Sequence, residues 1–234
     1  MMMRMRFAPR LVPTLAAVAM IALTLALGRW QAGRAEEKAA RQALLDARIR
    51  ETPVLLGGSS GPAEALLFRR GQARGTWIGE GQIFIDNQVE RGRAGFHVVT
   101  PLRLAGSTVA VLVNRGWIAR GPSYPQPPAV AVPAGEVEVL GLAALPPRRV
   151  LELSEETISG NAWQNLSIAR YEQRMRMKLV PVIVLAEQSP AGLVPVREKP
   201  GFGVEKHREY ALTWFSLAAT AFVLWVVMNL RRTP

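Results

Sequence analysis

Two uncharged apolar runs, one near each end of the chain, constrain its fold most. Residues 11–28 (LVPTLAAVAMIALTLALG) number 18 and residues 210–230 (YALTWFSLAATAFVLWVVMNL) number 21. A helix rises 1.5 Å per residue, so it needs about 20 residues to cross a hydrocarbon core of about 30 Å. The sequence therefore predicts two membrane-spanning helices. For the first run the alternative is a cleaved signal peptide, although its apolar stretch exceeds the usual length of about 7–15 residues.

The basic residues around these runs predict the orientation in the membrane. Residues 1–10 and 231–234 hold five arginines and no acidic residue. Because such residues favour the cytoplasmic side, we expect both tails in the cytoplasm and the chain between the spans outside. Only ten residues precede the first span, too few for a mitochondrial transit peptide. We therefore expect a two-pass protein of the bacterial inner (cell) membrane with a periplasmic domain.

The positive net charge does not indicate a nucleic-acid-binding protein. The chain carries +11, but removing the five tail arginines leaves +6, and no Lys/Arg run reaches five residues. We therefore expect the lipid bilayer and no nucleic acid as a partner. The absence of cysteine excludes disulfides, thiolate metal sites and cysteine nucleophiles. Two histidines and two aspartates leave little for a catalytic triad.

The central region changes from helical to strand-like patterns. An Ala-, Glu- and Arg-rich stalk is followed by short β-rich runs, a loop with five prolines at 121–135, a short helix at 167–177 and a last strand at 182–185. Asp86 and Asn87 predict a turn. The acidic pair Glu155 and Glu156 predicts a solvated loop. The predicted fold class is α+β: two transmembrane helices flank a mainly antiparallel β domain, a small barrel or sandwich, with one or two helices.

These patterns divide the chain into six expected segments. They are a cytoplasmic tail (1–10), transmembrane helix 1 (11–28), a helical stalk (29–52), the periplasmic β-rich domain (53–209), transmembrane helix 2 (210–230) and a cytoplasmic tail (231–234).

His207 is the residue best placed for chemistry at a membrane surface. It lies three residues before the second apolar run, where a neutral imidazole can be an axial ligand of haem iron. Tyr210 and Trp214, at i+3 and i+7, share its face if the helix begins here. Arg208 could pair with a haem propionate. The alternative, favoured by composition alone, is an interfacial histidine whose charged neighbours position the helix.

Four segments together resemble the Surfeit locus protein family of cytochrome c oxidase assembly factors. They occur in the order in which that family has them. They are residues 27–31 (LGRWQ), residues 74–77 (RGTW), residues 95–102 (GFHVVTPL) with 111–118 (VLVNRGWI), and residues 207–215 (HREYALTWF). The sequence departs from the family at Glu205, where an asparagine is usual.

The resemblance implies a non-enzymatic role in building haem–copper oxidases. It implies that the chain helps haem a reach, or enter, the catalytic subunit of cytochrome c oxidase, with haem a as a transient ligand and the haem a synthase as a second partner. His207 then becomes the haem ligand, with Arg208, Tyr210 and Trp214 around it. The first and third motifs supply the expected partner-binding residues. These are Trp30, Gln31, Asn114, Arg115, Gly116 and Trp117, the last four as a docking loop.

Two alternatives belong to other functional classes. One is a membrane scaffold or chaperone that holds the nascent oxidase subunit without binding haem. The other is a membrane-anchored enzyme, for which the sequence offers only glutamates and His97 as general bases. We therefore predict that the chain is not an enzyme.

Overall fold

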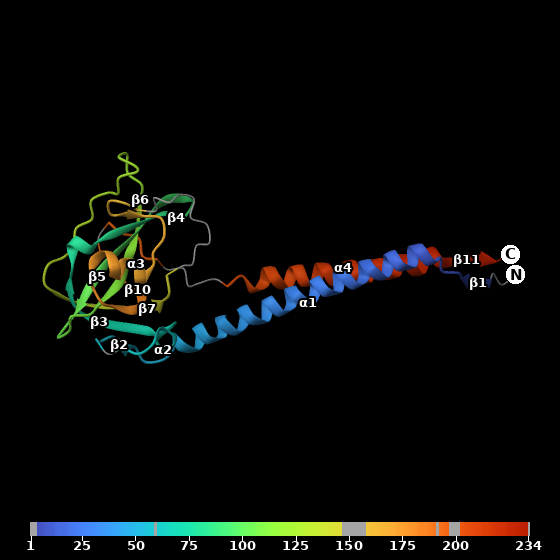
Figure 1. Ribbon diagram of the computed structural model, residues 1–234, viewed down its shortest axis with the longest axis horizontal. Coiled ribbons are helices and arrows are strands. Elements are labelled where there is room, and N and C mark those ends of the chain that lie inside the picture. Colours follow the sequence, from blue (N-terminus) through green and yellow to red (C-terminus); the bar gives the residue numbers. More distant parts are fainter. Residues whose placement is uncertain (1–3, 59, 147–157, 191, 197–201, 234) are drawn as a thin grey trace. The chain divides into compact units, whose positions relative to one another are not determined.

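The computed structural model describes residues 4–58, 60–146, 158–190, 192–196 and 202–233 (Figure 1). The chain forms two compact units. One consists of residues 1–44 and 200–234, and the other of residues 45–199. The acidic pair 155–156 lies outside the described residues.

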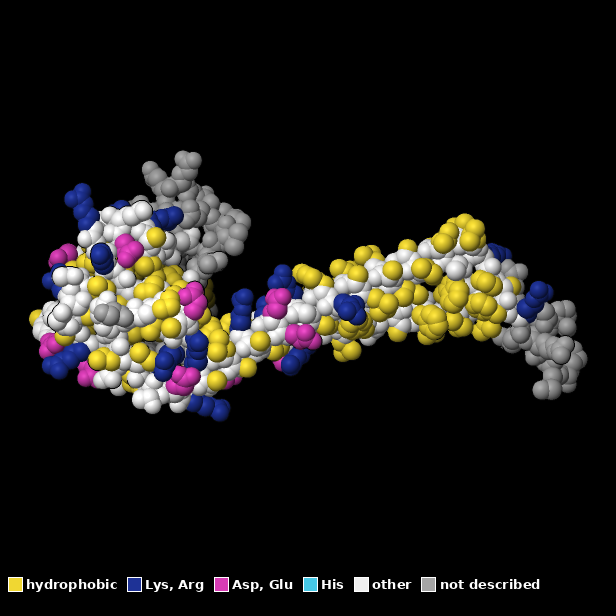
Figure 2. All heavy atoms as spheres, turned by 60° about the horizontal axis from the view of Figure 1, so that its bottom comes forward, with side chains coloured by type: hydrophobic (Ala, Val, Ile, Leu, Met, Phe, Trp, Pro, Cys, Tyr) yellow, Lys and Arg dark blue, Asp and Glu magenta, His cyan; other side chains and the backbone are white. Residues whose placement is uncertain are grey.

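The first unit is built on two long helices. Helix α1 (Leu11–Arg48) begins where the first apolar run begins and continues without a break through most of the expected stalk. Helix α4 (Val204–Asn229) begins before the second run. Both are long and apolar enough to cross a membrane, and hydrophobic side chains line them in Figure 2. At their ends, strand β1 (Arg4–Phe7) pairs antiparallel with β11 (Leu230–Thr233).

The two helices run antiparallel and meet along a narrow seam. Thr14 of α1 contacts Trp225 of α4, while Gln31 contacts His207. In α4, His207, Ala211, Trp214 and Ala218 all face inward to some degree, at spacings of 4, 3 and 4 residues. In α1 the same spacings join Thr24, Gly28, Gln31 and Ala35. This is the a/d spacing of helices that pack side by side, and small residues let helices approach in a membrane.

The second unit is a β barrel with short helices. Its elements are β2 (Val54–Leu55), α2 (Ala63–Leu66), β3 (Arg70–Trp77), the 3-10 helix η1 (Gly79–Gly81), β4 (Ile83–Glu90), β5 (Arg93–Leu104), β6 (Ala110–Ala119), β7 (Glu136–Ala144), β8 (Ile158–Ser159), β9 (Ala162–Trp163), α3 (Ile168–Met175) and β10 (Leu179–Ala186). The strand order is β2-β3-β7-β10-β6-β5-β4-β9-β8, and β3 also pairs with β5. This extra pairing closes β3, β7, β10, β6 and β5 into a ring. The expected α+β class is therefore confirmed, and of its two architectures the structure has the barrel.

Most pairings in the barrel are antiparallel. The exception among its ring strands is β6 with β10, which run parallel. This pair becomes possible because the chain crosses over through β7 and α3 before β10 enters the sheet.

Gly75 is the residue at which the barrel closes. It pairs with Val137 of β7 on one side and with Leu104 of β5 on the other. A Cβ at this position would lie 1.8 Å from the backbone oxygen of Arg103. Only glycine therefore allows β3 to approach both neighbours here.

Inside the barrel, apolar side chains form one core cluster, and α3 packs into a second cluster. Val111, Val113 and Val182 are fully buried members of the first cluster. Helix α3 lies within the range 167–177 predicted for a short helix. It begins after Ser167, whose hydroxyl accepts the Arg170 N–H at 3.4 Å. Its Tyr171 is fully buried and donates a hydrogen bond to the Gly81 carbonyl at 2.5 Å.

The turn expected at Asp86 and Asn87 is wrong. Strand β4 continues through both residues, and its register with β5 shifts between Ile85 and Gln88. Asn87 has a φ of +58°, so this is a bulge, which asparagine tolerates better than most residues. The reversal follows Glu90 instead, with Arg91 and Gly92 between β4 and β5.

Candidate functional site

The first and last motifs meet in one place between α1 and α4. The Nδ1 atom of His207 lies 2.6 Å from Oε1 of Gln31, although 176 positions separate the two residues. Both side chains are half-buried. The antiparallel seam described above produces the contact, because it places the end of the first apolar run beside the start of α4.

With Oε1 of Gln31 facing the ring, this contact is a hydrogen bond in the tautomer of His207 that carries its proton on Nδ1. The Oε1 atom of an amide only accepts hydrogen bonds, so Nδ1 is the donor in that tautomer. In the neutral ring, Nε2 then carries the lone pair. A metal-ligating histidine is commonly oriented in this way, by a hydrogen bond from its other ring nitrogen to an oxygen. The arrangement therefore suits Nε2 for binding a metal.

The other residues predicted around His207 lie on the same helix. Because α4 begins at Val204, Tyr210 and Trp214 follow His207 at helical spacing. Tyr210 is 47% exposed and Trp214 is half-buried. Arg208 forms an ion pair with Glu205 at 2.9 Å, in which both side chains are largely exposed. Such an exposed ion pair contributes little to stability. Arg208 can therefore release Glu205 and bind another anion.

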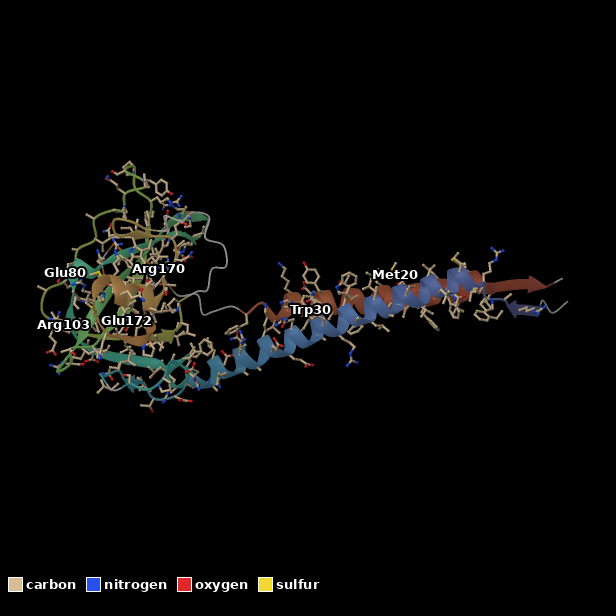
Figure 3. The ribbon with its side chains drawn as sticks, viewed as in Figure 1. Met20, Trp30, Glu80, Arg103, Arg170 and Glu172 are labelled. Atoms are coloured by element: carbon tan, nitrogen blue, oxygen red, sulfur yellow. The ribbon has the colours of Figure 1, made fainter. Side chains whose placement is uncertain are left out.

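A shallow hollow of about 420 Å³ lies on the flank of α4 that carries Arg208. Its lining is mainly apolar, from Ala32, Ala35, Ala39, Ala211, Leu212 and Phe215, with Glu36 and Arg208 as the charged members. Tyr210 and Trp214 occupy the other flank of α4, since successive residues turn about 100° around the axis. Trp30 is 54% exposed and follows Arg29 on α1 (Figure 3).

The docking loop expected at residues 114–117 is wrong. Asn114, Arg115, Gly116 and Trp117 belong to strand β6, and every one of them is buried. Asn114, Arg115 and Trp117 are 3%, 2% and 5% exposed. Their polar groups bond inside the domain, so these side chains offer no surface to a partner.

Arg115 fastens the proline-rich segment to the barrel. Its guanidinium donates to Gln82 Oε1 and to the Ala131 carbonyl, each at 2.8 Å, and lies 5.3 Å from the centre of the Trp77 ring. Its partners within the described residues are neutral, and burial lowers the pKa of Arg115. Gln82 also donates to the Val130 carbonyl at 3.1 Å. Arg115 is therefore a structural cation.

The neighbours of Arg115 hold the strand and the segment after β10 together. The Trp117 backbone exchanges two hydrogen bonds with Val194, at 2.7 and 2.8 Å, and its indole N–H donates to the Gln88 carbonyl at 3.0 Å. Asn114 Oδ1 accepts the Gly116 N–H at 3.1 Å. Gly116 has a φ of +138°, and a Cβ there would lie 2.8 Å from the Val194 oxygen. Glycine is required for that approach.

His97 faces a small cavity. With Asn114 and Asn165 it lines a space of about 30 Å³ in the second unit, which is about one water molecule in size. This space is too small for an organic substrate.

Comparison with known proteins decides the family. A family model described as the SURF1 family matches residues 18–219. The chain belongs to the SURF1 family. Surfeit locus protein 1 of Mus musculus is 26% identical over 91% of this chain and 74% of its own length. SURF1-like proteins of Monosiga brevicollis (23% identical, 88% of this chain, 84% of the relative) and Rickettsia felis (24%, 88% and 91%) are also similar.

For this SURF1-family chain, the two apolar helices indicate a two-pass membrane protein. The family match extends from the first helix to the second, so both sides of the Gln31–His207 contact lie within it. Sequence reasoning named both residues but assigned them to different roles. It missed Gln82, the hydrogen-bond acceptor of Arg115, because nothing in the sequence pattern distinguishes it.

Proposed function

We propose that this chain is a non-enzymatic assembly factor for a haem–copper cytochrome c oxidase, and that it assists the delivery of haem a to the catalytic subunit. Membership of the SURF1 family supports the oxidase role. The hydrogen bond between Gln31 and His207 supports the haem role, because it leaves the Nε2 lone pair for a ligand. The partners in this proposal are the catalytic subunit and the haem a synthase.

The residues around His207 suit an amphipathic, iron-containing molecule. Imidazole nitrogen is a common axial ligand of haem iron. Tyr210 and Trp214 lie on the same face of α4 as His207 and offer aromatic rings, and Arg208, on the other flank, offers a cation for a carboxylate. A single histidine ligand also suits a carrier, because a carrier must release what it binds.

The experiment is a visible spectrum of the detergent-purified protein from cells that make haem a. We expect reduced haem a bands in the wild type and their loss in His207→Ala. The matched control is His97→Ala, which removes the other histidine and keeps the bands. Haem retained equally in His207→Ala would contradict the assignment of the ligand.

The Gln31–His207 contact also favours a second candidate function. A hydrogen bond between two membrane helices stabilises their association without any ligand, as a scaffold for the nascent oxidase subunit would need. In that case the wild type carries no haem, while His207→Ala weakens the helix pair and oxidase assembly together.

The proposal places the chain in the bacterial inner membrane with its termini in the cytoplasm and the barrel in the periplasm. Because the chain has no cysteine, single cysteines report the orientation cleanly. Ser123→Cys, exposed on the barrel unit, should react with a membrane-impermeant maleimide in intact spheroplasts. Pro9→Cys, also exposed, should react only after lysis. The reverse pattern would overturn this orientation.

A further inference from the structure

Positive charge gathers where the two chain ends meet. Strands β1 and β11 pair in a register that sets Arg6 opposite Arg231 and Met5 opposite Arg232. Arg4 and Arg10 lie in the same part of the chain, while residues 1–35 and 210–234 contain no acidic residue. The side chains of Arg6 and Arg10 are exposed. This end of the helix pair therefore presents a cationic surface that favours an anion.

An open groove of about 460 Å³ begins at the same end of the helix pair. Arg10, Trp225 and Asn229 line its polar part. Its apolar walls come from Pro13, Ala17, Met20, Ala221 and Leu224. Met20 is labelled on α1 in Figure 3, well inside the apolar run. The groove thus joins a cationic, hydrogen-bonding end to an apolar stretch between two membrane helices.

Hydrogen bonds hold the polar end in a fixed arrangement. Asn229 is only 5% exposed; it accepts the Arg10 N–H at 3.3 Å and donates to the Trp225 carbonyl at 2.6 Å. The Trp225 indole N–H donates to Thr14 Oγ1 at 3.1 Å. The ring of Phe7, from β1, meets the Trp225 ring edge-on at 5.3 Å between centroids. These contacts connect the β1–β11 strand pair to the polar end of the groove.

We propose that this end of the helix pair binds an anionic phospholipid, with its phosphate at Arg6 and Arg10 and an acyl chain in the groove. The positive charge favours binding of an anion, and the apolar walls favour contact with a hydrocarbon chain. A phospholipid with a net negative headgroup supplies both in one molecule. It is also the anion present at the membrane surface where basic residues flank a span.

Native mass spectrometry of the detergent-purified full chain tests this proposal. The probe is an equal mixture of phosphatidylglycerol and phosphatidylcholine with the same acyl chains. We expect phosphatidylglycerol to be retained preferentially, and the preference to fall about fivefold for each arginine removed in Arg6→Gln/Arg10→Gln. The matched control, Arg91→Gln/Arg93→Gln, removes two exposed arginines of the barrel unit and should keep the preference.

A second pair of measurements separates a lipid from a free anion. Ala17→Leu/Ala221→Leu fills the groove without changing any charge, so lipid retention should fall. Inorganic phosphate should not displace the bound lipid. Equal retention of the two lipids, an equal loss in the control variant, full retention with the groove filled, or displacement by phosphate would each overturn the proposal.

Discussion

The side-chain amide of Gln31 and the imidazole of His207 lie 2.6 Å apart across the two membrane helices. Each belongs to a motif at a different end of the chain. The helix seam brings these separate motifs together, and the amide oxygen favours the tautomer that carries its proton on Nδ1. The same contact therefore has two consequences, one for helix association and one for ligand binding.

The first prediction concerns the protonation of His207. In the wild type at alkaline pH, ¹⁵N NMR of the imidazole should find the proton on Nδ1 and a bare Nε2. Gln31→Leu removes the acceptor, so the ring should shift toward a mixture in which the proton occupies Nε2. Gln173→Leu, on the exposed face of α3, should leave the spectrum unchanged. A proton on Nε2 in the wild type would contradict the tautomer inferred here.

Arg115 gives the second prediction. Arg115→Met removes the donor to Gln82 and Ala131, and we expect the barrel to lose about 2–4 kcal/mol of unfolding free energy. Arg115→Lys keeps the charge but lacks the planar guanidinium that reaches both acceptors. Its unfolding free energy should therefore lie between those of the wild type and Arg115→Met. Chemical unfolding in detergent measures both, and limited proteolysis at residues 121–135 reports the released segment.

The control for Arg115 is Arg103→Met, since Arg103 is exposed on β5. It should change the unfolding free energy by less than about 0.5 kcal/mol. If Arg115→Met were as stable as the wild type and as resistant to protease, Arg115 would not be the anchor of the proline-rich segment.

The parts of the fold that the sequence predicted are those with local signals. Both membrane helices follow from the length of the uncharged runs, and α3 lies within the short helix predicted at 167–177. The closure of the barrel has no such local signal in the sequence. It depends on β3 pairing with β5 and β7 together, and no short-range pattern at Gly75 reveals which strands meet there.

The site was predicted in part for the same reason. His207 was considered because it is one of two histidines and lies beside an apolar run, and the family resemblance then favoured it as a ligand over an interfacial histidine. Its contact with Gln31 joins positions 176 apart, which only the helix seam defines. Residues 114–117 were mistaken for a loop because Asn, Arg and Gly are common in loops, whereas here the buried hydrogen bonds of Arg115 keep them in a strand.

The third prediction concerns the closure of the barrel at Gly75. Gly75→Ala places a Cβ against the Arg103 backbone oxygen, which no side-chain rotation can relieve. We expect a loss of about 3 kcal/mol or more in unfolding free energy. Gly61→Ala, where a Cβ would lie 4.0 Å from the Ala65 Cβ, should have little effect. Equal stability of the two variants would show that β3 and β5 do not depend on this approach.

Tyr171 gives the fourth prediction, on the pH dependence of the barrel. Burial raises the pKa of Tyr171 above its ordinary value of 10.0. The folded chain then holds the phenolic proton at a pH where the unfolded chain releases it. This stabilisation is complete below about pH 10 and is lost as the pH rises above it, by up to about 1.4 kcal/mol per pH unit. Thermal unfolding between pH 8 and pH 11.5 measures the slope.

Tyr171→Phe separates this titration from other alkaline effects. It should flatten the slope above about pH 10, because the variant has no phenol to ionise there. At neutral pH it should cost about 1 kcal/mol, since the hydrogen bond to the Gly81 carbonyl is lost. Tyr124→Phe removes an exposed phenol that bonds Asp86 at 3.2 Å, and it should keep the steep slope. If Tyr171→Phe kept that slope as well, the alkaline loss of stability would come from a group other than Tyr171.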